Sequence, residues 1–125
     1  EYACRAGTTT AYSWGDDINA TLANYNVSGL SQTCDVGNYA ANPWGFFDMH
    51  GNVWEWTADW YQAAYPTGNP VVDPTGPASG SARVIRGGAQ GDIWADLRSA
   101  KRSDNHAPSD RLTYIGFRVG FQKSQ

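Results

Sequence analysis

Regular periodicity is confined to three short stretches of this chain, and in each it is the period of a β-strand. In residues 53–58 apolar and polar side chains alternate directly after a Gly-Asn pair, which favours a turn. Residues 82–88 and 114–122 predict two more strands, the last with apolar side chains at every second position. The first residues predict the end of a helix that Gly7 terminates. The sequence therefore predicts an α+β fold with a few antiparallel strands, little helix and much loop.

Long stretches between these strands have neither a helical nor a strand period. Residues 18–43 are polar, and residues 62–82 are rich in Pro and Gly. Irregular segments of this length in a small domain need contacts that hold them, such as a metal ion, tight aromatic packing or a disulfide. Cys4 and Cys34 could pair, but isolated cysteines commonly behave as small buried apolar residues, which favours free thiols.

The size and charge of the chain exclude several classes of protein. With 125 residues and no internal repeat, it is expected to form one domain over residues 1–125. Because it begins within what looks like a helix, we expect an N-terminal portion of the domain to precede Glu1. The formal net charge of −3 argues against a general nucleic-acid-binding domain. No apolar run approaches the roughly 20 residues of a membrane-spanning helix.

Two carboxylates flank the Gly-Asn turn and form the sharpest candidate for a metal site. Asp48 and Glu55 could supply charged oxygens and the intervening backbone neutral ones, a donor set that suits Ca²⁺. In the alternative, Asp48 caps a turn and Glu55 forms a salt bridge with an Arg. The spacing alone favours this alternative, because acids around turns are common.

No catalytic residues are expected from the spacing of nucleophiles and bases. His50 and His106 each lack a second His or Cys at ligand spacing, so a zinc site is not expected. Cys34 has no base near it in the sequence. The Gly-rich stretch at 87–91 lacks the Lys-Ser/Thr of a phosphate loop.

Three stretches together resemble the C-terminal half of the formylglycine-generating enzyme (sulfatase-modifying factor) family. They are "EYACRAGTTTAYSWGDD", "NPWGFFDMHGNVWEWTADWY" and "RVIRGG…LRSAKR…IGFRVGF". The resemblance implies an irregular C-type lectin fold and a structural Ca²⁺ site at Asp48, Gly51, Val53 and Glu55. Enzymes of the family bind copper through two cysteines in the segment after the Gly-Gly pair. That segment has no cysteine here, so no copper is expected.

The same sequence is also similar to the variable proteins of diversity-generating retroelements, which share this fold. An anchor pattern (Gly87-Gly88, Leu97 to Arg102, Pro108, Arg111 and Ile115 to Arg118) alternates with chemically miscellaneous positions. The resemblance implies that anchors such as Leu97, Ile115 and Phe117 fill the core. The positions between them would form a diversified surface that binds a protein or other macromolecular ligand. These positions are Ala89, Gln90, Gly91, Asp92, Ile93, Trp94, Asp96, Ser103, Asp104, His106, Asp110, Leu112, Thr113 and Tyr114.

Several interpretations stay open at this stage. The first is a non-catalytic binding domain that displays residues 89–114. Such a domain is compatible with a surface-exposed, secreted or virion-associated location. The second is an enzyme of the family, or a degenerate paralogue, that acts on cysteines of sulfatase-type protein substrates. The third is a structural accessory domain of a larger protein. For residues 89–114 themselves, one alternative to a displayed surface is that Trp94 is a core residue and the rest a solvated loop. A relative of the same fold whose loops have drifted in sequence would look similar.

Overall fold

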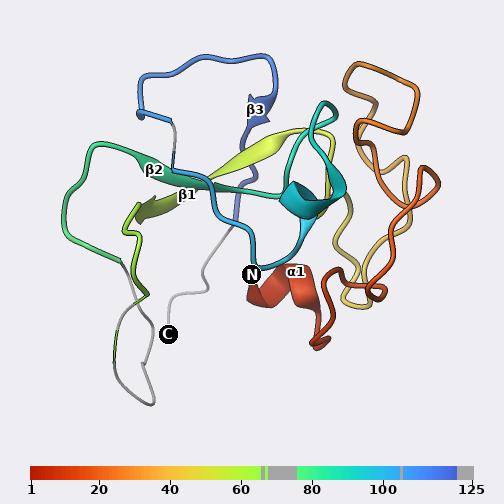
Figure 1. Cartoon of the computed structure of the whole chain (residues 1–125), viewed down its shortest axis with the longest axis horizontal. Helices are drawn as coiled ribbons and strands as arrows, with labels where there is room; N and C mark the ends of the chain where they lie inside the picture. Colours follow the sequence, from red (N-terminus) through yellow and green to blue (C-terminus); the bar gives the residue numbers. More distant parts are fainter. Residues whose placement is uncertain (66, 68–75, 105, 121–125) are drawn as a thin grey trace.

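A three-stranded sheet organises the chain, and long loops surround it (Figure 1). The computed structural model describes residues 1–65, 67, 76–104 and 106–120. In chain order its elements are helix α1 (Tyr2–Arg5), strands β1 (Trp54–Trp60) and β2 (Arg83–Arg86), the 3₁₀ helix η1 (Trp94–Leu97) and strand β3 (Ile115–Gly116). Little of the described chain is helical or extended, so the prediction of an irregular α+β fold is confirmed.

Strand β1 lies in the middle of the sheet, whose order is β2-β1-β3. It pairs with β2 in the antiparallel sense, as expected, and Glu55 lies opposite Arg86. It pairs with β3 in the parallel sense, and the same Glu55 lies opposite Gly116. The expectation of antiparallel strands is therefore wrong for β3. Residues 87–114 begin beside Glu55 on one side of β1 and end beside it on the other.

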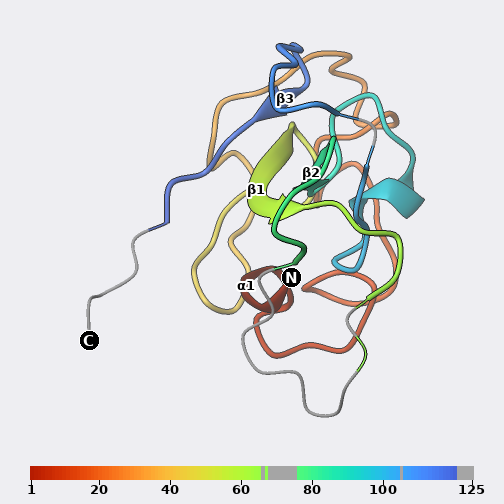
Figure 2. The same ribbon diagram turned by 90° about the vertical axis from the view of Figure 1, so that its left-hand side faces the viewer.

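Strand β3 is much shorter than the predicted strand over residues 114–122. Only Ile115–Gly116 is extended and paired, and the chain after it runs away from the sheet (Figure 2). Phe117, expected in the core, is 78% exposed, so that expectation is wrong. The physical reason is that β3 is an edge strand that ends at Gly116, and beyond it no layer of the described structure covers the next apolar side chain. Phe121, on the same predicted face, lies outside the described residues.

Two small clusters form the core. One contains Tyr12, Ala23, Tyr25 and Leu97, and the other contains Trp54, Ile85 and Ala89. Leu97 is fully buried, as expected of an anchor, and Ile115 packs against the second cluster. Leu97, within residues 89–114, and Ile115, directly after them, therefore connect this segment to the two clusters.

Buried asparagine side chains hold the long loops in place. Asn42 donates to the carbonyl of Ala3 at 2.7 Å and accepts from the backbone amides of Trp44 and Phe46. Asn52 accepts from the backbone amide of Cys34 at 2.9 Å and donates to the Cys34 carbonyl at 3.2 Å. These hydrogen bonds hold loops for which the sequence suggested a metal ion, aromatic packing or a disulfide. Cys4 and Cys34 are both free thiols in this structure.

The sequence correctly predicts the end of a helix at the N-terminus, but the left-handed cap is Ala6, one residue before Gly7. Ala6 adopts the left-handed conformation with φ of 49°, and its amide donates to the carbonyl of Tyr2.

Within the described residues, no helix combines the length and the apolar character that a membrane span requires.

Candidate functional site

A cavity of about 390 Å³ opens between β1, the turn after β2 and the segment before β3. We call it the 89–114 pocket. Its lining residues are Trp54, Ala89, Gln90, Gly91, Asp92, Asp96, Lys101, Ser103, His106 and Tyr114. Eight of these ten belong to the fourteen positions that the sequence assigns to the variable surface.

One wall of the pocket is a tight turn that follows the double glycine. Gly87 and Gly88 both have positive φ, at 98° and 77°, which an L side chain rarely adopts. A Cβ on Gly88 would meet the Leu97 side chain at 2.7 Å, so this turn packs directly on the core. The Asp92 carboxylate then accepts the Ala89 amide at 2.8 Å and closes the turn. Residues 89–92 are therefore fixed by the two glycine conformations and by the Asp92 side chain.

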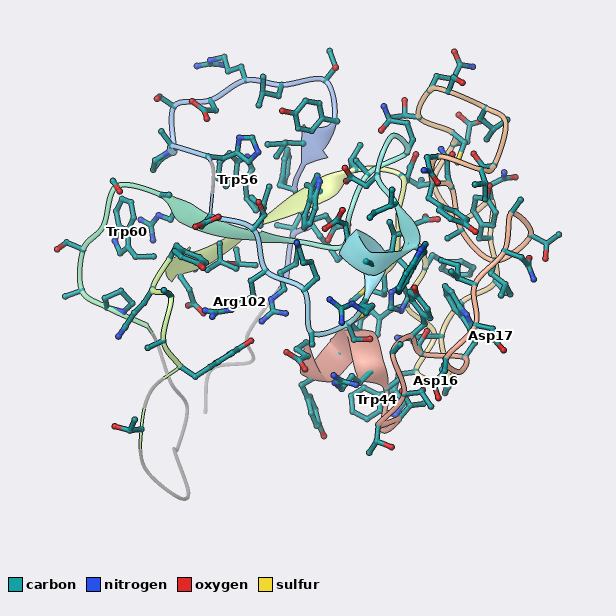
Figure 3. The ribbon with its side chains drawn as sticks, in the orientation of Figure 1. Asp16, Asp17, Trp44, Trp56, Trp60 and Arg102 are labelled. Atoms are coloured by element: carbon teal, nitrogen blue, oxygen red, sulfur yellow. The ribbon has the colours of Figure 1, made fainter. Side chains whose placement is uncertain are left out.

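The opposite wall is attached to the sheet. Ser103 exchanges backbone hydrogen bonds with Ile85 at 3.1 and 3.3 Å, and the Tyr114 carbonyl accepts the Trp54 amide at 2.9 Å. His106 lies between Trp56 and Tyr114, with ring centroids 6.4 and 6.0 Å away. Figure 3 shows Trp56 on the side of the sheet that faces this segment.

Some polar groups of the pocket have an ion-pair partner, and one buried acceptor has no hydrogen-bond partner in the described part of the chain. Lys101 Nζ lies 2.7 Å from Asp96 Oδ1, and His106 Nδ1 lies 3.4 Å from Asp110 Oδ2. Gln90 Oε1 is buried and has no hydrogen-bond partner among the described residues. A buried acceptor without a partner usually needs an explanation, such as a missing water or ligand.

The remaining predicted positions form the rim or lie outside the pocket. Ile93, Trp94 and Leu112 are 50%, 58% and 38% exposed. The exposure of Trp94 argues against the alternative in which it is a core residue. Asp104 and Thr113 are also exposed.

Ala89 corrects one expectation. It was expected on the displayed surface, but it is 3% exposed and packs with Trp54 and Ile85. The Gly88 turn directs it inward, so it contributes to the pocket floor.

Sequence reasoning missed two lining residues, Trp54 and Lys101. Trp54 is read from sequence as a strand residue, and nothing local shows that its ring forms a pocket floor. Lys101 lies within the Leu97 to Arg102 anchor pattern, which predicts a role in the frame and not in the pocket lining.

The four predicted calcium ligands do come together. Asp48, Gly51, Val53 and Glu55 line a second cavity of about 500 Å³, together with Arg118. Arg118 makes a bidentate pair with Glu55, at 3.0 and 2.7 Å, and Asp48 Oδ2 accepts the Gly37 amide at 2.6 Å. This pattern of a turn cap and an Arg salt bridge is the alternative that the spacing favoured. Asp48 Oδ1, however, is buried without a partner in the described structure.

The comparisons with known proteins assign the family. The family model described as "Sulfatase-modifying factor enzyme 1-like domain" matches residues 1–122. The chain belongs to this family. It is 36% identical to the formylglycine-generating enzyme of Streptomyces coelicolor, over 94% of this chain and 43% of that one. It is 39% identical to the serine/threonine-protein kinase pkn1 of Chlamydia caviae, over 92% of this chain and 18% of the kinase.

Among solved structures, Treponema denticola variable protein 1 superposes with a TM-score of 0.81 and 34% identity, over 93% of this chain and 42% of that one. The fold is therefore the irregular C-type lectin fold that the sequence resemblance implied, and the likeness to a variable protein is confirmed. The chain spans less than half the length of these relatives.

The cysteines of this family member lie away from the 89–114 pocket. Cys4 Sγ is buried 3.5 Å from both His50 Nε2 and Ser99 Oγ, and burial raises the pKa of its thiol. Cys34 is partly exposed beside Asn52. Among the described residues no cluster of three or more His, Cys, Asp or Glu side chains could hold a metal. The lining of the pocket presents two carboxylates, an amide, a hydroxyl, an ammonium, an imidazole and two aromatic rings.

Proposed function

We propose that this chain is a non-catalytic binding domain that recognises a protein ligand through the 89–114 pocket and its rim. The observation that supports this most is the convergence of eight sequence-predicted positions on one concave surface. Positions scattered over a loop with no common role would not be expected to face one cavity.

The composition of the surface supports a macromolecular ligand. Exposed Trp94, Ile93 and Leu112 lie within two residues in sequence of positions that line a polar cavity, and protein interfaces and antibody paratopes use such a mixture. The frame beneath is held by backbone bonds to β1 and β2, so side chains can change without loss of the fold. Diversification of residues 89–114 is part of this proposal. An adenine-rich template repeat near the gene, and variation confined to these positions in the source population, would support it.

Binding is tested with a displayed library of random peptides, selected on the native chain. Gly91→Phe fills the pocket entrance, where a Cβ meets no atom within 4 Å. Gly120→Phe is the matched control, because Gly120 is equally open but outside the pocket. We expect selected peptides to lose at least about tenfold in affinity on Gly91→Phe and none on Gly120→Phe. Enrichment of no peptide with this dependence would overturn the proposal.

An enzyme of the formylglycine-generating type is the second candidate, favoured by the names of several relatives. Such activity would need thiolates beside the pocket, and neither Cys4 nor Cys34 lines it. Oxygen consumption by the copper-loaded chain with a cysteine peptide tests this candidate directly. An accessory role within a longer protein is the third candidate, supported by the match to a small part of a kinase.

Calcium is proposed as a structural ion. The donor set fits in part: Asp48 Oδ1 is available, and Glu55, Gly51 and Val53 line the same cavity. Calcium bound there would tie the Gly-Asn turn to β1. Arg118 now holds Glu55, so the ion and the guanidinium would compete for one carboxylate.

A further inference from the structure

The polar side of the 89–114 pocket is rich in hydrogen-bond acceptors. Gln90 Oε1 is buried and unpartnered among the described residues. The Asp92 carboxylate uses one oxygen for the Ala89 amide, which leaves further acceptor capacity. Lys101, the lysine of the lining, is already engaged by Asp96 at 2.7 Å. The lining therefore has acceptor capacity at Asp92 and, if its side chain turns toward the cavity, at Gln90.

The net charge of the lining also favours a ligand rich in hydrogen-bond donors. Asp92 and Asp96 give two negative charges, Lys101 gives one positive charge, and Asp110 lies just beyond, paired with His106. Arg98, the cation nearest in sequence to Asp96, is exposed and donates to the Ala95 carbonyl. The pocket is therefore net negative when His106 is neutral, and it favours a cationic group.

The walls of the pocket add a geometric preference. Trp54 and Tyr114 present aromatic surface, and the polar groups gather around Gln90 and Asp92. A guanidinium is planar, carries five donors in a fixed fork and stacks on aromatic rings, whereas an ammonium is a compact and strongly hydrated charge.

We propose that the 89–114 pocket binds an arginine side chain of a protein ligand. In this arrangement the guanidinium donates to the Asp92 carboxylate and lies against the aromatic wall. The Gln90 side chain turns toward the ligand, so that its Oε1, buried without a partner in the described part of this structure, accepts a hydrogen bond from the guanidinium. The inference rests on the proposed binding function, and it assigns the chemical class of the group that occupies the pocket.

The test uses two small probes of nearly the same shape, N-acetyl-arginine methylamide and its citrulline counterpart, in which a neutral urea replaces the guanidinium. Binding is followed by NMR at the Gln90 side-chain amide and the Asp92 backbone amide. We expect the arginine probe to shift both signals and the citrulline probe to bind at least about tenfold more weakly. Equal binding of the two probes, or no shift at either residue, would overturn the inference.

Two matched variants separate local recognition from bulk charge. Asp92→Asn keeps an oxygen for the Ala89 amide but removes the charge, whereas Asp17→Asn makes the same change at an exposed position outside residues 89–114 and outside the pocket. We expect Asp92→Asn to weaken arginine binding at least about fivefold and Asp17→Asn to leave it unchanged. Equal effects of the two variants would contradict the inference.

The peptide library distinguishes failure of the arginine inference from failure of the proposed binding function. Peptides that depend on the pocket but contain no arginine would refute the arginine inference and leave the binding function intact. A library with no pocket-dependent peptide at all would refute the binding function itself.

Discussion

His50 Nδ1 lies 2.7 Å from the carbonyl oxygen of Leu97, a residue 47 positions further along the chain. The Ser13 amide donates to the other ring nitrogen at 3.2 Å, so the neutral tautomer with hydrogen on Nδ1 satisfies both bonds. The ring also packs edge-on against Tyr12 and Trp14. One buried side chain thus joins the N-terminal loops to an anchor within the binding segment.

This arrangement predicts a loss of stability in acid. Burial lowers the pKa of His50 in the folded chain, and the bond to Leu97 only partly opposes this. The unfolded chain therefore takes up the proton first. The contribution of His50 is fully present above the unfolded pKa of about 6.5, and it decreases as the pH falls from there toward the folded pKa.

The measurement is the free energy of unfolding in urea at about pH 7.5 and about pH 5.5, since the window lies below about 6.5. The native chain should lose more stability between these values than His50→Gln, whose baseline stability is lower. Parallel slopes for the two proteins would contradict the prediction.

Gly51 is expected to tolerate no side chain. Its φ is +83°, and a Cβ there would collide with the Asn24 backbone carbonyl. Gly51→Ala should destabilise the chain by about 2–4 kcal/mol, through backbone strain and displacement of that loop. Gly91→Ala is the control, because nothing lies within 4 Å of its Cβ, and it should change stability by less than about 0.5 kcal/mol. Chemical denaturation would show the difference.

Substitution of a buried anchor should lower the free energy of unfolding much more than substitution of an exposed one. Leu97 is fully buried, so Leu97→Ala should cost about 2–5 kcal/mol. Phe117 is 78% exposed, so Phe117→Ser should cost less than about 0.5 kcal/mol. A large cost at Phe117 would mean that it packs in solution in a way that this structure does not contain.

Calcium should compete with Arg118 for Glu55. If the ion binds, an excess of about 100-fold over its Kd stabilises the chain by about 2.7 kcal/mol, and the melting temperature rises. Arg118→Gln should enlarge that rise, because it frees the carboxylate, and Glu55→Gln should abolish it. Identical melting with calcium and with chelator, in both the native chain and Arg118→Gln, would exclude the site.

The sequence predicts those parts of the fold whose signals are local. The alternation around Trp56 and the preceding Gly51-Asn52 turn define β1, and the β-branched pair in β2 defines its partner. The parallel pairing of β3 depends on contacts between distant residues, which a single sequence does not reveal. Alternation also shows that Ile115 and Phe117 share a face, but not whether any layer covers that face.

The site could be predicted to a similar extent. The anchors locate the segment that forms the pocket, because miscellaneous residues between regular ones point to exposure. They do not show that the Gly88 turn directs Ala89 inward, nor that Lys101 reaches Asp96. The asparagines that hold the loops are invisible for the same reason, since Asn52 and Cys34 are 18 positions apart.

The pairing of Glu55 with both Arg86 and Gly116 affects how easily the segment between these two residues can accept insertions. Arg86 and Gly116 flank the same residue of β1, so the segment between them has its two ends fixed about two strand spacings apart, roughly 10 Å. The entropic cost of closing such a loop grows only with the logarithm of its length, about 0.6 kcal/mol for each doubling. Insertions between the two clamped ends should therefore be inexpensive, and relatives can differ in the size of this segment as well as in its residues.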